Sequence, residues 1–600
     1  MIPARKLAVR LTDTSGEPGS PWSRIAPYGV FLAITAFFGV FLIWPVLRVV
    51  IVGLGLSGTG AKLELTPSYL SAVFSSYEFR VSLFNSAAIA CAVTLLSAAI
   101  SVPLALLSRR FEFRGKGVVT SLLLVPLVLP PFVGALGLRQ IFGASGALTA
   151  LCRILGLVPH DAAVNWLTAH QFLAVVIAEA LSLYPILFLN VVAALSNLDP
   201  AMEQAAANLG ASSWRIFRSI TLASVRPGLF AGGAIVFIWS FGELGTPLMF
   251  DLYTVAPVQI FFHITEISDN PIPYALVIVM LLVSAAVYIA GKLAVGRADL
   301  AQTRVSFAKA AEPVTGFRTL WVLLPFVIII ALALLPHIGV VLTSFSQTGS
   351  WYNSVLPRVF TEDQYVHALS HQIVLSSIRN SMVFSLFSVV LDIVIGTAIA
   401  VLIVRSRLPG VLRGIVDTLS MLPLAVPGMV LAFGYLAISL QFKVWFLGHD
   451  GLLQYADVQR NPTLLLVLAY TMRRLPYIVR STVAGLEQTP PDLELAARNI
   501  GASGATTLRR ITMPLIGANV IAGALLVFAF TMLEVSDSLI LVQKQAYWPV
   551  TRGIYELFQR LGDGPYIASA LGAWTMLLMM LVILFVNSLL GKRLGALFRI

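Results

Sequence analysis

Cysteine and charged side chains are both scarce in this chain. The only two cysteines are Cys91 and Cys152, one in an apolar stretch and one in a more polar connection, so they predict neither a disulfide framework nor a metal-ligand cluster. Charged residues make up 11% of the chain, hydrophobic residues make up 58%, and the mean hydropathy is +0.88. A soluble globule of 600 residues needs more polar surface than this. We therefore expect an integral membrane protein.

Two functional signatures are also missing. The pattern G-x-x-x-x-G-K-[ST] does not occur, so the chain is not expected to hydrolyse ATP through a phosphate-binding loop. Lys and Arg outnumber Asp and Glu by 40 to 28, but no patch interleaves basic and aromatic residues. The basic excess therefore predicts membrane topology and no nucleic-acid partner.

Long apolar stretches predict twelve transmembrane helices. Each stretch has about 20 residues or more, which as an α-helix crosses a hydrocarbon core of about 30 Å. The first six fall at 27–51, 82–107, 118–142, 171–196, 227–250 and 273–294, and the last six at 319–345, 376–404, 415–440, 463–485, 518–542 and 567–590. Short and long connections follow in the same order in both sets. The fold expected is an all-α polytopic membrane protein with two homologous six-helix halves.

A polar sequence that occurs twice supports this duplication. Glu203 begins EQAAANLGAS, and Glu494 begins ELAARNIGAS 291 positions later. At the same offset Pro200 aligns with Pro491. A match at a fixed offset is typical of an internal repeat.

Basic residues predict the orientation of the two halves. Lys and Arg that flank a span are retained on the cytoplasmic side, and most of them gather there if the N-terminus is inside. We expect both termini to be cytoplasmic. The chain then divides into a cytoplasmic N-terminal segment (1–26), a first half (27–295), a cytoplasmic linker (296–318) and a second half (319–600). The repeated sequence lies in cytoplasmic loops 197–226 and 486–517.

Each copy of the repeat predicts two short helices joined at a glycine corner. Glu203 and the alanines after it favour helix, while Gly210 suits the left-handed residue that ends a helix. Ser212 is placed to cap the next helix, and Gly501 and Ser503 repeat the pattern. One such corner is common in helical proteins. Two equivalent copies favour a docking surface for a partner.

At these residues the chain resembles the membrane subunits of type I ABC importers, whose cytoplasmic loop carries an EAA motif and a downstream Ile-x-Leu-Pro. Residues 511–514 read ITMP, which is close to that pattern, whereas residues 220–223 read ITLA and lack the proline. The fusion of two six-span halves is most similar to ferric-iron importer permeases. It also resembles the permeases for 2-aminoethylphosphonate, thiamine and polyamines.

The resemblance implies a transport subunit that is not itself an enzyme. In that family a separate ATPase, present in two copies, binds ATP and Mg on the cytoplasmic side, and a periplasmic binding protein delivers the solute. The chain would be a multi-pass protein of the bacterial inner membrane and would bind no cofactor. The residues expected to make or shape the ATPase contact are Glu203, Ala206, Gly210, Glu494, Ala497 and Gly501.

Arg473 and Arg474 are candidates for the translocation pathway because they lie within the tenth predicted span. A charge near the bilayer centre costs about 3 kcal/mol or more unless it faces a cavity or a partner. Arginines at a pathway would suit an anionic cargo, or iron carried with an anion, and would repel free cations. Alternatively they pair with acidic groups such as Asp392, Glu179 or Glu534, or they extend toward the cytoplasm.

Other intramembrane residues form aligned pairs. Glu243 and Glu534, near the outer ends of the fifth spans, either line a gate or are helix-end charges. Pro130 and Pro427 bend the third spans, either for packing or to line the pathway. The nearest histidine pair, His367 and His371, has no third ligand, so no metal site is assigned.

Ferric iron is the cargo that the resemblance favours, with 2-aminoethylphosphonate, thiamine or a polyamine as alternatives. A rival from another class is a secondary transporter driven by an ion gradient, which also commonly has twelve spans and internal repeats. The repeat is best matched in a loop and not in a broken helix at the midplane. This favours the importer.

Overall fold

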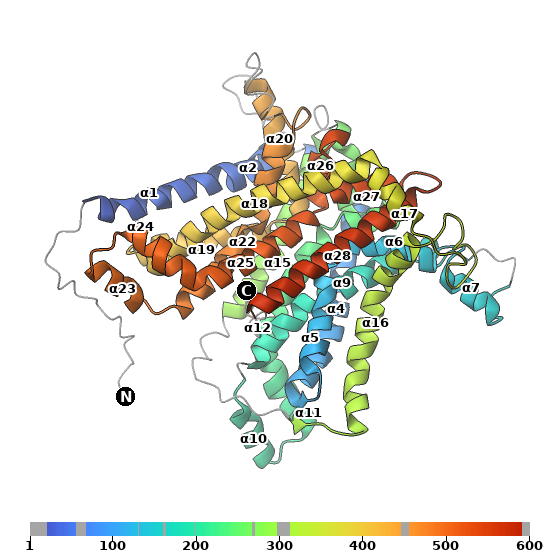
Figure 1. Ribbon diagram of the computed structural model, residues 1–600, viewed down its shortest axis with the longest axis horizontal. Coiled ribbons are helices and arrows are strands. Elements are labelled where there is room, and N and C mark those ends of the chain that lie inside the picture. Colours follow the sequence, from blue (N-terminus) through green and yellow to red (C-terminus); the bar gives the residue numbers. More distant parts are fainter. Residues whose placement is uncertain are drawn as a thin grey trace.

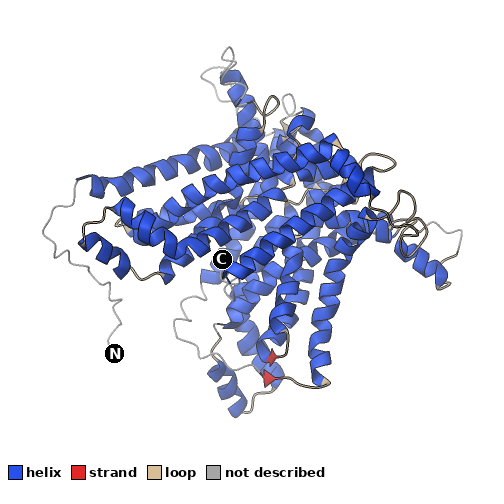
Figure 2. Cartoon of the chain, viewed as in Figure 1, coloured by secondary structure: helices blue, strands red, loops and turns tan. Residues whose placement is uncertain are grey.

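The computed structural model describes residues 21–55, 68–129, 131–159, 164–196, 198–266, 271–296, 312–445, 455 and 457–590. Most of the expected N-terminal segment, most of the linker and Pro130 lie outside these ranges. Long helices dominate the fold (Figures 1 and 2). This confirms the all-α polytopic fold.

Every predicted span coincides with one or more helices. In the first half these are α1 (Pro21–Phe38) continued by η1 (Gly39–Ile43) and α2 (Trp44–Gly53), α4 (Tyr77–Arg110), α5 (Lys116–Val128) with α6 (Pro131–Phe142), α9 (Gln171–Ser196), α12 (Leu222–Phe241) and α15 (Ile272–Gly296). In the second half they are α16 (Arg318–Ser344), α18 (Gln372–Arg405), α19 (Gly410–Met421) with α20 (Gly428–Trp445), α22 (Thr463–Gln488), α25 (Met513–Met532) and α28 (Gly564–Leu590).

Within the described ranges, nine helices are long and apolar enough to cross a membrane, and two bent pairs raise the number to eleven. The remaining predicted span, 463–485, forms the 26-residue helix α22. It falls short on composition because Arg473, Arg474 and Arg480 interrupt its apolar sequence. Arginines are tolerated at that depth only where protein or water surrounds them.

The third span of each half is broken and not continuous. α5 ends at Val128 and α6 begins at Pro131, and in the second half α19 and α20 meet at 101° beside Pro427. A proline lacks the N–H that the helix ladder needs, so the chain turns there. Such a break is stable in a membrane only where protein covers the freed carbonyls.

The fifth spans end earlier than the sequence suggested. The expected helices 227–250 and 518–542 are wrong at this end: α12 stops at Phe241 and α25 at Met532. Each is followed by a turn and a short buried helix, α13 (Gly245–Met249) or α26 (Ser536–Leu541). Because the residues on both sides of the turn are apolar, hydropathy alone does not reveal the break.

The first span of each half packs against the other half. α1 and α2 contact α18, α19 and α20, while α16 contacts α5, α6 and α9. In Figure 1 the blue α1 lies along the yellow α18, and the yellow-green α16 lies beside α5. The two sequence repeats therefore exchange contacts through their first helices, which also pack against α15 and α28 of their own halves.

Small polar residues line the closest helix contacts within each half. Ser101 of α4 donates a hydrogen bond of 2.8 Å to the carbonyl of Tyr184 in α9, and Ser388 of α18 accepts one of 3.2 Å from Thr471 in α22. Short side chains let helix backbones approach closely where lipid gives no hydrophobic driving force. These contacts hold α9 and α22 against the second span of their half.

An asparagine near the start of each second span has a similar structural partner. Asn85 of α4 donates to the carbonyl of Thr254, and Asn380 of α18 donates to that of Ala546, both at 2.9 Å. Each asparagine connects the N-terminal part of its helix to the segment before a short helix, α14 (Ala256–Phe262) or α27 (Val550–Phe558). They support a role in packing.

A two-stranded parallel ribbon joins the start of the second half to the first. β1 (Phe111–Glu112) follows α4, and β2 (Glu312–Pro313) precedes α16. The amide of Val314 donates to the carbonyl of Glu112 at 2.9 Å. This pairing, shown as red arrows in Figure 2, holds α16 beside α5 of the other half.

The exchanged helix α16 depends on a close approach between Gly339 and Gly137 of α6. A Cβ built on Gly339 would lie 2.9 Å from the Cα of Gly137, closer than real Cβ contacts. We expect Gly339→Ala to destabilise the protein by about 1–3 kcal/mol through overpacking. The matched control Gly29→Ala, in a helix with open space around it, should be neutral or slightly stabilising. Thermal unfolding in detergent measures both, and equal midpoints would contradict the exchanged packing.

Candidate functional site

Both copies of the repeat form the predicted helix–corner–helix. In the first motif loop α10 (Pro200–Asn208) leads through Gly210 to α11 (Ser213–Ile216), and in the second α23 (Asp492–Asn499) leads through Gly501 to α24 (Gly504–Thr507). The two glycines have φ of +81° and +89°, which side chains rarely adopt. Ser212 and Ser503 accept hydrogen bonds from the amides of Arg215 and Thr506, as expected for helix caps.

The motif glutamates point into the protein. Glu203 accepts a 2.7 Å hydrogen bond from Thr221 at the start of α12, and its carboxylate lies 3.6 Å from Arg109 at the end of α4. In both halves the glutamate therefore joins the motif helix to the second and fifth spans, since Glu494 has the same kinds of partner.

The glutamate of the second motif loop is the more buried of the two and has the closer basic partner. Glu494 accepts 3.1 Å hydrogen bonds from Thr512 and from Nε of Arg405, and only 6% of the residue is exposed. Arg405 also donates to the carbonyls of Leu486 and Thr489 at 2.8 Å. The glutamates therefore shape the loops from inside, as does the buried Ala497, while Ala206 is half-buried.

The exposed tips of the motif loops are apolar and were not singled out from the sequence. Leu209 is 89% exposed and Ile500 is 87% exposed, and the two align at the 291-residue offset. Each directly precedes the corner glycine of its loop. The turn at that glycine leaves the side chain of Leu209 or Ile500 pointing away from the protein. The sequence does carry a signal for these tips, because an apolar residue stands just before the glycine in both copies of an otherwise polar motif.

The two loop surfaces are not equivalent. Trp214 of α11 is 68% exposed, and its ring lies tilted against that of Phe217 with the centroids 5.5 Å apart. Ala505 and Leu508 take these places in the second loop. A partner that docks on both loops meets an aromatic surface on only one of them.

A cavity of about 120 Å³ lies between the two halves, and we call it the interhalf cavity. The first half supplies Glu179 and Ser182 from α9, Trp239 from α12 and Glu243 from the turn after α12, and the second half supplies Arg473, Arg474, Phe530 and Glu534. A smaller cavity of about 50 Å³, lined by Pro427, Gly428 and the same arginines, adjoins it. Four of the predicted pathway residues, Arg473, Arg474, Glu243 and Glu534, therefore share one cavity, and Pro427 lies next to it.

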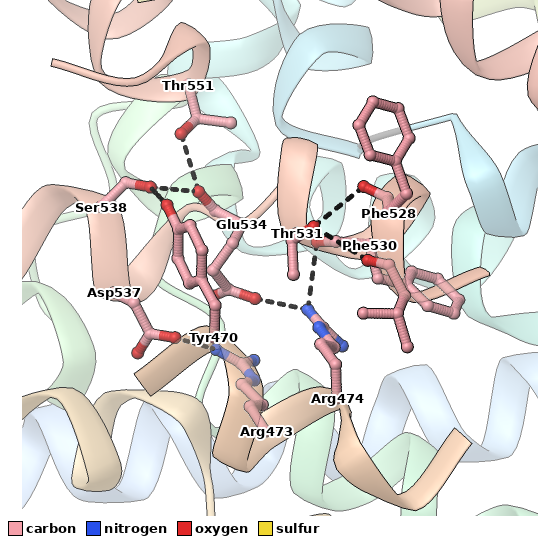
Figure 3. Close-up of polar contacts among 11 residues, drawn as sticks. Tyr470, Arg473, Arg474, Phe528, Phe530, Thr531, Glu534, Asp537, Ser538 and Thr551 are labelled. Carbon is pink, nitrogen blue, oxygen red and sulfur yellow. Dashed lines mark hydrogen bonds and ion pairs between the residues drawn. The ribbon is translucent and has the colours of Figure 1, made fainter. Parts of the chain in front are cut away.

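Glu534 pairs with both arginines. Its two carboxylate oxygens accept hydrogen bonds from Nη1 of Arg473 and Nη2 of Arg474. Figure 3 shows the contact with Arg474 and the neighbouring contact between Arg473 and Asp537. Asp537 lies 3.7 Å from Arg473, and Arg474 stands over the ring of Phe530 at 5.1 Å. Of the acidic partners that the sequence suggested, Glu534 is the one that the described structure pairs with these arginines.

The break after α25 positions Glu534. Its backbone carbonyl accepts hydrogen bonds from Ser538 at 2.6 Å and from Thr551 at 2.7 Å, and Ser538 in turn contacts the hydroxyl of Tyr470 at 2.7 Å (Figure 3). These hydroxyls satisfy a carbonyl that the helix has released. The broken fifth span therefore carries the carboxylate into the cavity.

The absence of a side chain at Gly428 leaves room for the guanidinium of Arg473. A Cβ on Gly428, at the start of α20, would overlap the Arg473 guanidinium, and a Cβ on Gly242 would lie 2.9 Å from Pro427 of the other half. The turn after α12 in the first half and the break before α20 in the second half therefore meet at the cavity. Arg480 lies away from it, 3.5 Å from Asp417 of α19.

The first half contributes a different charge to the cavity. Glu179 of α9 accepts a hydrogen bond from Ser240 of α12, and Oε1 of Glu243 accepts from the amides of Gly245 and Thr246 at 3.2 and 3.3 Å. At the 291-residue offset Glu179 aligns with Tyr470, and Ser182 aligns with Arg473. The facing fourth spans therefore carry an acid in one half and arginines in the other.

Comparison with known proteins identifies the family. Residues 100–299 and 392–596 each match the model for the binding-protein-dependent transport system inner membrane component. The ferric transport system permease protein FbpB of Actinobacillus pleuropneumoniae is 26% identical over 94% of this chain and 78% of its own length. The putative ferric transport system permease protein FbpB 1 of Haemophilus influenzae is 27% identical over 80% of this chain and 71% of its own.

A relative with a different printed cargo matches one part of the chain. The probable molybdenum ABC transporter permease protein of Haloferax volcanii is 34% identical over 34% of this chain and 71% of its own length. Relatives named for different cargoes therefore share the fold. The twofold match confirms the fused halves, and the chain belongs to the family of binding-protein-dependent transport system inner membrane components, as a multi-pass ABC importer permease.

Proposed function

We propose that this chain is the permease subunit of an ATP-driven importer whose cargo is ferric iron delivered by a periplasmic binding protein. The observation that carries the proposal is the pair of motif loops, each with a glutamate hydrogen-bonded to a threonine at the start of the fifth span and with an exposed apolar tip. The cargo rests on the two ferric permease relatives, one of which spans 94% of the chain.

The motif loops are the docking sites for two copies of an ATPase subunit, which bind ATP and Mg. Leu209 and Ile500 insert into the ATPase, and Gly210 and Gly501 present them. Glu203 and Glu494 transmit movement, because each connects its loop to the base of a fifth span. The far ends of these spans reach Glu243 and Glu534 at the interhalf cavity.

Transport then follows from differential binding of two states. ATP binding draws the two loops together and opens the cavity toward the binding protein, and hydrolysis returns it. This assigns both termini to the cytoplasmic side of a bacterial inner membrane. The interhalf cavity is the point on the path that both halves line.

A secondary transporter is the alternative class. Broken helices at a repeat interface are also found in such proteins, so the breaks beside Pro131 and Pro427 do not separate the two classes. The paired motif loops do, because an ion-driven transporter has no use for two equivalent apolar tips.

The apolar tips give a first test. We expect Leu209→Ser and Ile500→Ser each to weaken ATPase association about tenfold, or about 1.4 kcal/mol, because an exposed apolar contact is lost. Leu561→Ser is the matched control: Leu561 is 96% exposed and also precedes a glycine with positive φ, but it lies outside the motif loops. Co-purification with the cognate ATPase measures the effect. Equal retention by all three variants would contradict docking at the tips.

The different surroundings of Glu203 and Glu494 predict that the two loops contribute unequally to ATP-driven uptake. Glu494→Ala removes a buried partner of Arg405 and should loosen its loop by about 2 kcal/mol, while the more exposed Glu203→Ala should cost less than about 1 kcal/mol. ATP-driven uptake should fall more in Glu494→Ala. Hydrogen exchange of residues 486–517 reports the loosening, and a larger effect from Glu203→Ala would reverse this assignment.

Reconstitution tests the transport class and the cargo. In liposomes with the ATPase and the binding protein, radiolabelled ferric iron should accumulate only with ATP. The chain alone should transport nothing under a proton or sodium gradient. Gradient-driven uptake would establish a secondary transporter, and ATP-driven uptake of 2-aminoethylphosphonate, thiamine or a polyamine in place of iron would change the cargo.

A further inference from the structure

Two arginines make reciprocal contacts between the halves. Arg139 of α6, in the first half, stands over the ring of Phe558 of the second half, 5.0 Å from its centroid. Arg552 of α27, in the second half, stands 5.9 Å from the ring centroid of Phe261 of the first half. A guanidinium within about 6 Å of an aromatic face is attracted by the charge distribution of the ring. Each half therefore holds a ring of the other.

Each arginine is also fixed within its own half. Arg139 forms an ion pair of 2.8 Å with Asp251 and donates a hydrogen bond of 2.8 Å to the carbonyl of Met249. Arg552 forms an ion pair of 2.6 Å with Glu556 of the same helix. Only the contact with the opposite ring crosses the interface. The halves can therefore separate at these rings while each arginine keeps its carboxylate.

A third contact joins equivalent residues of the two halves. Phe261 and Tyr555 meet edge to face, with ring centroids 6.3 Å apart and planes at 90°. α14 and α27 are equivalent helices, because the first amide of each donates to a serine of the second span of its half, Ser86 or Ser381. Phe261 and Tyr555 both stand at the sixth position of their helix. Equivalent residues of two related halves touch at the pseudo-twofold axis between them, so this aromatic contact lies on the axis.

The interhalf cavity lies on the same axis, since the aligned residues Glu243 and Glu534 both line it. From these residues the chain continues in each half through a buried short helix, α13 or α26, to α14 or α27. Figure 1 shows α27 far from the motif helices α10 and α23. A path that leaves the cavity along the axis on this side must pass the rings of Phe261 and Tyr555.

We propose that Phe261 and Tyr555 close the outer end of the transport path. The two reciprocal arginine contacts hold this closure shut, because both must break before the halves separate there. The proposal rests on the proposed function only in taking the interhalf cavity as part of the transport path. Cation–π contacts are individually weak, so a partner that docks on the outer face can separate them, and they re-form when it leaves.

Labelling of a cysteine in the cavity tests the closure on the full-length chain in right-side-out membrane vesicles. The parent chain carries Cys91→Ser, Cys152→Ser and Val535→Cys, since Val535 lines the cavity and is partly exposed. A small membrane-impermeant methanethiosulfonate added outside should react slowly with it. We expect labelling at least about tenfold faster with Phe261→Ala or Tyr555→Ala, because a ring that blocks the path is removed. Phe261→Tyr keeps the ring and should stay slow.

Phe262→Ala is the matched control, because Phe262 follows Phe261 in α14 but its ring pairs with Tyr253 of the same half, at 5.4 Å. It should label as slowly as the parent chain. Phe558→Ala removes the ring under Arg139 and leaves the ion pair of that arginine, so it should also speed labelling. Thermal midpoints show whether each variant is folded, and either ring variant of the axial contact suffices for the test.

The outcomes separate this closure from the proposed function. Labelling rates within about twofold of the parent chain in both Phe261→Ala and Tyr555→Ala would overturn the closure, as would equal acceleration by Phe262→Ala. The labelling reaction needs neither ATPase nor binding protein. Failed iron uptake with ring-dependent labelling would therefore overturn the function alone, and ATP-driven iron uptake with ring-independent labelling would overturn the closure alone.

Discussion

Lipid offers no hydrogen bonds to a polypeptide, and most of this structure follows from that constraint. In the described ranges the predicted spans satisfy most of their backbone as helix, and the breaks within the third and fifth spans are covered by other helices. The breaks beside Pro131 and Pro427, and those after Phe241 and Met532, all lie at the contact between the halves. Irregular backbone and charged side chains are therefore concentrated at the interhalf cavity.

The exchange of first helices holds the two halves together. α16 lies on the first half through Gly339, and α1 and α2 lie on the second, so neither half can leave without unpacking a span. Movement is then restricted to what the remaining helices allow. α12 and α25 are suited to it, because each extends from a motif loop to a cavity carboxylate.

Duplication and divergence divide the work between the halves. The features that both halves retain are those of the motif loops: the hydrogen-bonded glutamate, the glycine corner and the apolar tip at Leu209 and Ile500. The features that differ line the cavity, where Glu179 and Tyr470 occupy equivalent positions and Arg473 replaces a serine. The motif loops are therefore built on one plan in both halves, whereas the two walls of the interhalf cavity differ in their charged residues.

The sequence by itself determined the span positions, the duplication and the glycine corners, because hydropathy, offset and local propensity are local properties. It also identified Arg473, Glu243 and Glu534 as charges in apolar surroundings. Only the tertiary structure decided that Glu534 pairs with both arginines, that the first helices are exchanged, and that Glu179 bonds to Ser240 of α12. These depend on which distant helices meet, and apolar spans of similar composition carry no record of their neighbours.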